Sequence, residues 1–198
     1  MQCDYYLDSA AEKKRYALHN NSLLNTGYVR YLESFIDSVL GFPAIFDQKN
    51  IKMQEIVDYG SGPEPSLATL LQKRGFTVRC YDPYFAPEMV LPGKLADFVT
   101  CLEVAEHFKE PIKDFALIVN CIRENGFLAL ATHLMPAFTN ETEQIAFFSS
   151  WWYRQDPTHV SFFTEKALRI VAGGAGLSWL GQAGPHIYIF KKNREVLR

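Results

Sequence analysis

The sequence has few cysteines, no long apolar run and no excess of charge of one sign. Its four cysteines, Cys3, Cys80, Cys101 and Cys121, form no Cys-x-x-Cys pair, which argues against a disulfide framework or a cysteine-based metal cluster. No apolar run approaches the roughly 18 residues that span a bilayer, and the N-terminus has no apolar signal segment. We therefore expect a reduced, cytoplasmic protein without membrane association.

The charge balance and the composition narrow the class further. Twenty Lys and Arg against 22 Asp and Glu give a net charge of −2, whereas duplex-DNA binders take much of their affinity from positive charge facing phosphate. We therefore expect no nucleic-acid partner. The chain is 48% hydrophobic and 21% charged, which is typical of globular proteins, and its length suits a single domain over residues 1–198.

Apolar periodicity predicts strands that alternate with helices up to residue 133. The predicted strands cover residues 56–59, 76–81, 97–102 and 126–133, and the predicted helices cover residues 9–20, 28–40, 65–74 and 111–123. This alternation favours an α/β fold with a doubly wound, mostly parallel sheet. A helix over 164–173 and strands over 177–183 and 186–191 follow; the last two are joined too tightly for a parallel crossover and must pair antiparallel.

Two segments depart from this regular plan. Only 14 residues separate Asp82 from Asp97, so we expect one middle βα unit to be shortened. Residues 134–163 lack a regular pattern, and a long structureless segment in a compact domain is usually a lid or a binding element. The predicted organisation is a helical cover over 1–45, a cofactor-binding core over 50–133, a substrate segment over 134–163, and a closing helix and strand pair over 164–192.

The strongest local signal is the segment Ile56-Val57-Asp58-Tyr59-Gly60-Ser61-Gly62. A strand runs into a glycine-rich turn and then a helix, and glycine permits positive φ and the close approach of a ligand. Asp82 ends the next strand, where a carboxylate can accept the hydroxyl protons of a ribose. Pro65 replaces the third glycine of the G-x-G-x-x-G fingerprint, which disfavours a nicotinamide-dependent oxidoreductase. A tight turn without a ligand is the alternative interpretation.

Four segments follow one another along the chain: IVDYGSGP, YDPYF, DFVTCLEVAEHF and GFLALAT, closed by the antiparallel strand pair. Together they resemble class I S-adenosylmethionine-dependent methyltransferases over about residues 50–190. The stretches RYALHNNSLLNTGYVRYLESFID and WWYRQDPTHVSFFT also resemble a bacterial subgroup of that family. The resemblance implies a Rossmann-like fold, S-adenosylmethionine as cofactor and methyl transfer to a small-molecule O or N acceptor. Glu64 departs from the family pattern, which often has a glycine there.

The resemblance also implies the residues that bind the cofactor. They are Asp58, Gly60, Gly62, Asp82, Pro83, Leu102 and Glu103. The two glycines would lie against the methionine part of the cofactor, and the aspartate before them would orient that loop or the amino group. The second aspartate would bind the ribose hydroxyls, with the proline and Tyr84 near the adenine. The last two residues would flank the sulfonium.

His107, just beyond the predicted 97–102 strand, is the first candidate for a general base. An imidazole has a pKa near neutrality, and a methyl acceptor that carries a proton must lose it. The alternative is that His107 bonds to the backbone and shapes its loop. Glu103, Glu106 and His107 also raise the question of a metal site, but they lack the helical spacing of zinc ligands, so we expect no metal.

The aromatic segment and the N-terminal region supply the other candidates, and aromatic residues are unusually frequent at 14% of the chain. The expected catalytic residues are His107 and His159, and the expected substrate-binding residues are His19, Asn21, Tyr28, Trp152, Tyr153 and Arg154. We expect the aromatic rings from Phe147 to Phe163 to help build the acceptor pocket. The alternatives are a packed aromatic lid with an Arg–Asp pair, and helix capping by Asn21 or Ser22. The alternative function is a non-catalytic module that keeps the fold and binds a nucleoside.

Overall fold

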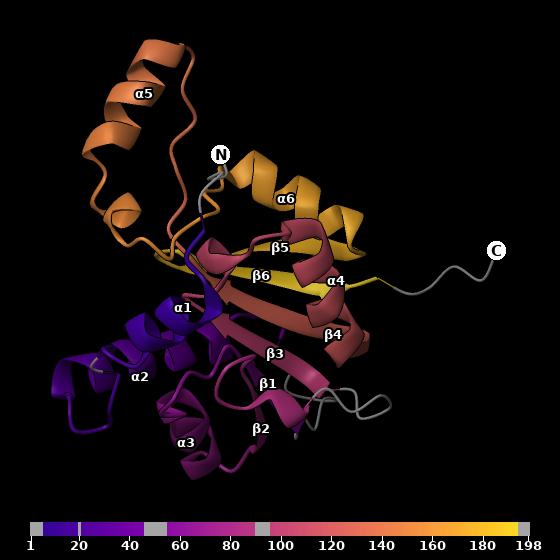
Figure 1. Ribbon diagram of the computed structural model, residues 1–198. Coiled ribbons are helices and arrows are strands. Elements are labelled where there is room, and N and C mark those ends of the chain that lie inside the picture. The colour runs from indigo at the N-terminus through magenta and orange to yellow at the C-terminus, as the bar shows by residue number, and fades with distance from the viewer. Residues whose placement is uncertain (1–5, 20, 46–54, 90–95, 194–198) are drawn as a thin grey trace.

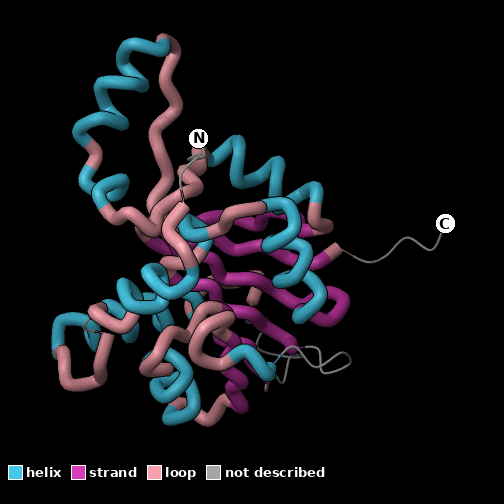
Figure 2. The backbone as a smooth tube through the Cα atoms, viewed as in Figure 1, coloured by secondary structure: helices cyan, strands magenta, loops and turns pink. Residues whose placement is uncertain are grey.

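The computed structural model describes residues 6–19, 21–45, 55–89 and 96–193, so Cys3 lies outside the described residues. A six-stranded sheet runs through the centre, with helices on both faces (Figures 1 and 2). Within these ranges, no helix combines the length and the apolar character needed to cross a membrane.

The elements follow one another largely as the periodicity predicts. The strands are β1 (Glu55–Tyr59), β2 (Thr77–Tyr81), β3 (Ala96–Leu102), β4 (Ile122–Ala131), β5 (Leu177–Gly184) and β6 (Ile187–Lys192). The α-helices are α1 (Ser9–Tyr16), α2 (Thr26–Leu40), α3 (Ser66–Lys73), α4 (Pro111–Cys121), α5 (Glu141–Ser150) and α6 (Glu165–Gly174). Short 3₁₀ helices are η1 (Pro87–Met89), η2 (Ala105–His107) and η3 (Trp152–Gln155).

The strand order β2-β1-β3-β4-β6-β5 confirms the predicted doubly wound fold. Strands β2, β1, β3 and β4 pair in parallel, and β6 pairs antiparallel with both β4 and β5. Within the sheet, β2 lies on one side of β1 and β3 lies on the other. The chain reaches β2 through α3 and then returns past β1 to form β3. Between β2 and β3 the described residues hold only the short η1, which agrees with a shortened middle unit. The switch point therefore lies at the carboxyl ends of β1 and β3, where such folds bind ligands.

The sheet buries one apolar layer on each face. On one face, α2 contributes Leu32, Phe35, Ile36 and Val39, whose i, i+3, i+4, i+7 spacing places them on a single stripe. On the other face, α4 and α6 pack against the sheet through residues such as Phe115, which is fully buried. These two layers fix the strand ends that carry the polar residues.

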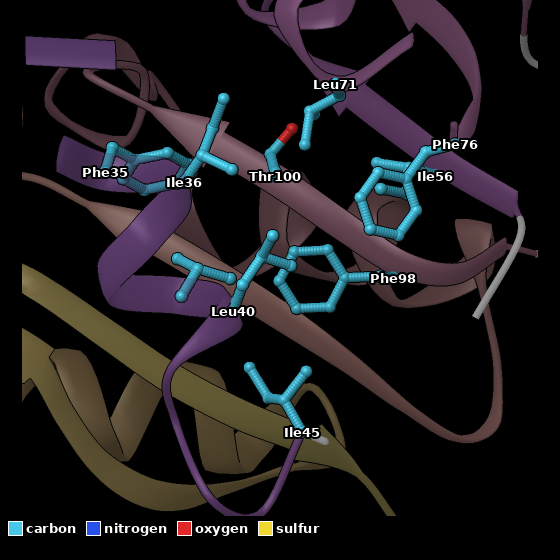
Figure 3. A pocket seen from close by; sticks show the side chains of 10 residues that line it. Phe35, Ile36, Leu40, Ile45, Ile56, Leu71, Phe76, Phe98 and Thr100 are labelled. Atoms are coloured by element: carbon cyan, nitrogen blue, oxygen red, sulfur yellow. The ribbon is translucent and has the colours of Figure 1, made fainter. Parts of the chain in front are cut away.

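A small apolar cavity of about 10 Å³ lies beneath α2 (Figure 3). Its walls are hydrocarbon apart from Thr100, whose hydroxyl donates a hydrogen bond to Asp58 Oδ1 at 2.9 Å. A void of this size is barely large enough for one water, and an apolar void has too few polar partners to hold it. It is therefore a packing defect in the core and not a ligand site.

Three details of the structure differ from the sequence-based expectations. Residues 134–163 are not structureless, because Glu141–Ser150 form α5, capped by Asn140, whose side chain accepts a hydrogen bond from Glu143 N. Helix α5 buries none of its residues and projects from the body of the molecule (Figure 1), so it lacks the apolar stripe that reveals other helices. Strand β4 begins directly after α4, earlier than predicted, and α1 ends at Tyr16 instead of continuing to residue 20.

Candidate active site

A cavity of about 500 Å³ lies at the carboxyl ends of β1, β2 and β3. This volume is in the usual range for small-molecule sites, and its position is the switch point of the sheet. Its wall combines the glycine turn after β1, the end of β2, the segment after β3, parts of α1 and α2, and residues 152–159. Segments far apart in the sequence therefore meet around one space.

The turn after β1 uses its two glycines for different reasons. Gly60 has φ +82°, and a Cβ there would lie 2.3 Å from the Val104 side chain. Gly62 has φ +68°, and a Cβ there would meet nothing within 4 Å. The first glycine thus allows the turn to pack against the segment after β3, while the second permits a left-handed backbone beside open space.

Asp82 ties the end of β2 to this turn. Its Oδ2 accepts a hydrogen bond from Gly62 N at 3.0 Å, and its Oδ1 accepts from Tyr84 N at 2.8 Å and Phe85 N at 3.1 Å. The carboxylate is therefore held rigidly at the cavity wall. Each oxygen can accept more than one hydrogen bond, so Oδ2 retains capacity for a ligand hydroxyl.

Asp58 lies beneath the turn and not in the cavity wall. It is buried, and its Oδ2 has no hydrogen-bond partner among the described residues. Burial raises the pKa of Asp58 to about 6, although the hydrogen bond from Thr100 opposes this shift. Its position allows it to orient the glycine turn from below.

Two glutamates follow β3, the first partly buried and the second completely buried. Glu103 has a left-handed backbone, φ +52°, and its carboxylate accepts hydrogen bonds from Tyr31 Oη at 3.1 Å and Tyr153 Oη at 3.2 Å. Glu106 is completely buried; Thr132 Oγ1 donates to its Oε2 at 2.9 Å, while its Oε1 has no partner among the described residues. Burial, with repulsion between the pair acting on Glu103, raises the pKa of both carboxyls above the usual range.

Two histidines face each other beside these glutamates. His107 Nδ1 lies 2.9 Å from the Thr158 carbonyl oxygen, and His159 Nδ1 lies 2.6 Å from the Tyr153 carbonyl oxygen. A carbonyl oxygen can only accept, so each Nδ1 carries the hydrogen and each Nε2 keeps its lone pair. Burial lowers the pKa of both imidazoles, that of His159 to about 4. Both rings are therefore neutral at pH 7.

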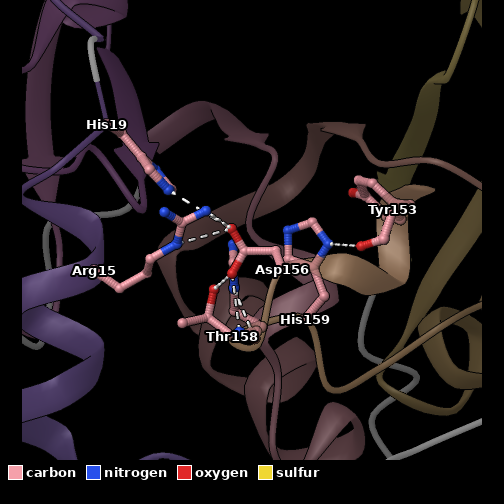
Figure 4. A network of polar contacts seen from close by, with 7 residues as sticks. Arg15, His19, Tyr153, Asp156, Thr158 and His159 are labelled. Carbon is pink, nitrogen blue, oxygen red and sulfur yellow. Dashed lines mark hydrogen bonds and ion pairs between the residues drawn. The ribbon is translucent and has the colours of Figure 1, made fainter.

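Helix α1 is fastened across this region by ion pairs (Figure 4). Arg15 donates to Asp156 Oδ2 at 2.7 Å, and His19 Nε2 lies 3.8 Å from the same oxygen. Burial alone would raise the pKa of Asp156, but the nearby His19 and hydrogen bonds from Arg15 and Thr158 lower it well below its usual range. On the same helix, buried Glu12 pairs with Lys109 Nζ at 2.7 Å and accepts a hydrogen bond from the Tyr84 hydroxyl.

A family model described as a methyltransferase domain matches residues 28–180, which is most of the chain. The chain belongs to this methyltransferase family. Its fold is that of class I S-adenosylmethionine-dependent methyltransferases, and family membership implies S-adenosylmethionine as the methyl donor. No curated protein matches the chain.

Solved methyltransferases share the fold at low sequence identity. An O-methyltransferase family protein from Burkholderia thailandensis aligns with a TM-score of 0.65 and 14% identity, over 94% of this chain and 64% of that protein. A SAM-dependent methyltransferase from Methanosarcina mazei aligns with a TM-score of 0.53 and 13% identity, over 78% of this chain and 99% of that protein. The aligned region thus spans less than two thirds of the length of the Burkholderia protein.

The cavity of this methyltransferase gathers most of the residues expected from the sequence. Those in its wall are Gly60, Gly62, Asp82, Pro83, Leu102, Glu103, His107, His159, His19, Asn21, Tyr28, Trp152 and Tyr153. Their roles remain predictions. The side chain of Glu64, where the family often has glycine, is exposed and does not line the cavity.

Arg154 lies away from the cavity. Its Nη1 donates to the Ser149 carbonyl oxygen at 3.1 Å, and its guanidinium lies 5.4 Å from the centre of the Phe148 ring. The expected Arg–Asp pair exists, but Arg15 of α1 is the partner of Asp156. Arg154 is only two residues from Asp156 in the sequence, but its guanidinium bonds elsewhere. Arg15, far away in the sequence, is the arginine that approaches Asp156.

The aromatic segment divides between the cavity and its own cluster. Trp152 and Tyr153 line the cavity, whereas other rings of the segment pack mainly on one another. The rings in that cluster are Phe138, Phe147, Phe148, Trp151 and Phe162. The expectation that the whole segment from Phe147 to Phe163 builds the pocket is therefore only partly met. Likewise, Asn25 and not Asn21 or Ser22 caps α2, accepting from Gly27 N and Tyr28 N.

The sequence reasoning did not identify several cavity residues. Glu12 and Tyr16 lie four residues apart on α1, and a polar or aromatic pair at that spacing shares one face of a helix. Tyr31 lies on α2, and its hydroxyl reaches Glu103. The i, i+4 spacing was the available signal for α1, whereas nothing local reveals the contact of Tyr31.

Proposed function

We propose that this chain binds S-adenosylmethionine at the glycine turn and Asp82, and methylates an O or N atom of a small molecule held by the opposite wall. The observation that carries this proposal is that one cavity connects the two groups of residues. Family membership supports the methyl-transfer part, and the acceptor class is our own inference.

The described residues fit the cofactor at one end of the cavity. The left-handed turn at Gly62 leaves open space beside the backbone, and the fixed Asp82 carboxylate suits the two hydroxyls of a ribose. Pro83 and Tyr84 follow in the wall, where they would contact the adenine. When bound, S-adenosylmethionine supplies a methyl carbon whose bond to sulfur breaks, leaving its electron pair on sulfur, as the acceptor lone pair forms the new bond.

The opposite wall fits a small polar acceptor. Tyr28, Tyr31, Trp152 and Tyr153 provide ring surface, and the neutral imidazoles of the two cavity histidines can accept a proton or a hydrogen bond at Nε2. Helix α1 closes over this end through the Arg15–Asp156 pair. The residues thus exclude water and position the acceptor, which are the protein's main contributions to group transfer.

Calorimetric titration with S-adenosylmethionine and S-adenosylhomocysteine tests the cofactor site directly. We expect both to bind, and Asp82→Asn to weaken both at least tenfold, because one carboxylate oxygen becomes an amide that cannot accept a ribose hydroxyl. Asp37→Asn, on the exposed face of α2, is the matched control and should bind as the unmodified protein does. Absence of binding at millimolar concentration would contradict the proposal.

A methyl-release assay over a broad panel of hydroxyl and amine acceptors tests turnover. Product from any acceptor, lost in Asp82→Asn and kept in Asp37→Asn, supports the enzyme. Tight cofactor binding without turnover across the panel favours the alternative of a nucleoside-binding module that retains the fold.

A further inference from the structure

Glu106, His107 and His159 bring three potential metal ligands together at the acceptor end of the cavity. One ligand atom from each residue lies within 4.8 Å of the others. Glu106 and His107 belong to η2, whereas His159 arrives from a segment more than fifty residues later. We propose that these three side chains bind a divalent metal ion.

Both imidazoles are oriented as metal ligands are. Each Nδ1 is directed at a backbone carbonyl, that of Thr158 for His107 and that of Tyr153 for His159. This leaves each Nε2 lone pair free, and a histidine that ligates a metal usually donates its other N–H to such a partner. The ring centroids are 4.8 Å apart, and one ligand atom of each ring lies within 4.8 Å of the other and of the Glu106 carboxylate.

Glu106 supplies the observation that points independently to a cation. Its side chain is completely buried, Thr132 holds Oε2, and Oε1 has no partner among the described residues. A buried polar atom without a partner is costly, and a buried carboxylate requires a cation, a hydrogen-bond donor or a proton. A metal ion held by Glu106 and the two histidines would supply this carboxylate with the missing partner.

A second carboxylate lies beside the three proposed ligands. Glu103 lies beside Glu106, and its left-handed backbone, φ +52°, keeps a second carboxylate in this buried region. Strained backbone of this kind is typically retained where function requires it. Two neighbouring carboxylates repel each other, and a divalent cation beside them would relieve that repulsion.

The ligand types indicate the class of ion. Imidazole nitrogen suits zinc and the other first-row transition metals, and carboxylate oxygen also suits manganese. Metal–ligand bonds of about 2.1 Å in a tetrahedral site place the ligand atoms roughly 3.4 Å apart, so atoms that lie within 4.8 Å of one another must move together by at most about 1.4 Å. Mn²⁺, Co²⁺ and Zn²⁺ are therefore the ions to test. Three protein ligands leave positions open, as in catalytic metal sites.

The role of the ion rests on the proposed function. With the ion bound, both Nε2 atoms are ligands and no longer accept a proton. An open coordination position facing the cavity would instead bind the acceptor through its nucleophilic oxygen and lower the pKa of that hydroxyl, a recognised effect of bound divalent ions. The proposed methyl acceptor is then narrower than any compound with an O or N acceptor atom: it is a compound whose hydroxyl group binds the metal ion. It also replaces the sequence-based expectation of no metal, which overlooked His159 because spacing along the chain does not reveal it.

The binding test uses the full chain, treated with a chelator and then titrated with Mn²⁺, Co²⁺ and Zn²⁺ by calorimetry, with the Co²⁺ absorption spectrum as a second readout. We expect one ion per chain, and at least tenfold weaker binding in Glu106→Gln, His107→Asn and His159→Asn. Glu110→Gln, on an exposed glutamate, and His186→Asn, in the turn between β5 and β6, are the matched controls. Thermal unfolding of each variant verifies that it is folded.

Separate titrations distinguish failure of this inference from failure of the proposed function. Metal binding at the site with no binding of S-adenosylmethionine would support the metal site and contradict the methyltransferase proposal. Binding of S-adenosylmethionine with no metal binding below 1 mM (an affinity of about −4 kcal/mol) would overturn the metal site alone. Equal metal affinity in the three site variants and the two controls would also overturn it.

Discussion

The two ends of the cavity are held together by different kinds of interaction. Most of the cofactor end comes from one stretch of chain, β1 to the residues just after β2, and its turn is held by backbone hydrogen bonds from Gly60 N and Ser61 N to the Tyr81 carbonyl oxygen. The acceptor end comes from three distant segments, and ion pairs and buried polar contacts hold it, such as Arg15 with Asp156.

This difference predicts opposite sensitivities. A backbone turn packed against its neighbours tolerates changes of exposed charge nearby, but neither an added side-chain atom nor a change of the buried charge of Asp58 beneath it. A wall assembled from charged pairs tolerates small changes of shape but responds to charge, salt and pH. Three substitutions test this comparison, beginning with the one expected to have the largest effect.

Gly60→Ala should have the largest effect on stability, about 2–4 kcal/mol of unfolding free energy. The variant combines a left-handed alanine, which costs about 1–2 kcal/mol, with overlap of its Cβ and Val104. Urea unfolding measures the loss, and calorimetry should show weakened binding of S-adenosylmethionine.

Gly75→Ala is the matched control for that substitution. Gly75 also has positive φ, +92°, but a Cβ there meets nothing within 4 Å. We expect only the backbone cost of about 1–2 kcal/mol. Equal losses in the two variants would show that contact with Val104 is unimportant, and the contrast drawn for the cofactor end would fail.

Asp58→Asn should flatten the dependence of stability on pH. Burial raises the pKa of Asp58 from 3.8 to about 6, so its folded-state proton stabilises the protein at low pH. That contribution is complete below pH 3.8 and is lost as pH rises through about 6, a change of about 3 kcal/mol. Unfolding free energies measured from pH 4 to 7 should decline less in the variant.

Asp37→Asn serves as the control for this pH experiment, since Asp37 is 72% exposed. Its stability profile should follow that of the unmodified protein. If Asp58→Asn retains the full decline between pH 4 and 7, burial of this carboxyl is not its cause.

Arg15→Ala should have the smallest effect on stability, under about 1 kcal/mol, because its side chain is 40% exposed and water screens the pair. The loss should shrink further at high salt, as measured by unfolding at two ionic strengths. Arg154→Ala, which removes the arginine nearer in sequence to Asp156, should show no such salt dependence. If Arg154→Ala and not Arg15→Ala showed a loss that depends on salt, Arg154 would be the partner of Asp156, as the sequence suggested.

The strands of the sheet could be predicted because the signals for each one lie close together in the sequence. The apolar run of β1, the glycines after it and Asp82 all lie within residues 55–82, and each follows from period, turn chemistry or strand position. The antiparallel closing pair followed from a connection too short for a crossover. Helix α5 was not predicted because none of its residues is buried, so its sequence lacks the periodic apolar stripe by which a helix is recognised.

The sequence by itself determined the doubly wound sheet, the glycine turn and the acid at the end of β2, because each depends on neighbours along the chain. Only the tertiary structure decided that Arg15 meets Asp156 and that His159 joins Glu106 and His107. Those contacts depend on how distant segments pack over the strand ends, and no periodicity encodes that arrangement. The part of the cavity that would distinguish one acceptor from another is therefore the part that folding, and not local pattern, assembles.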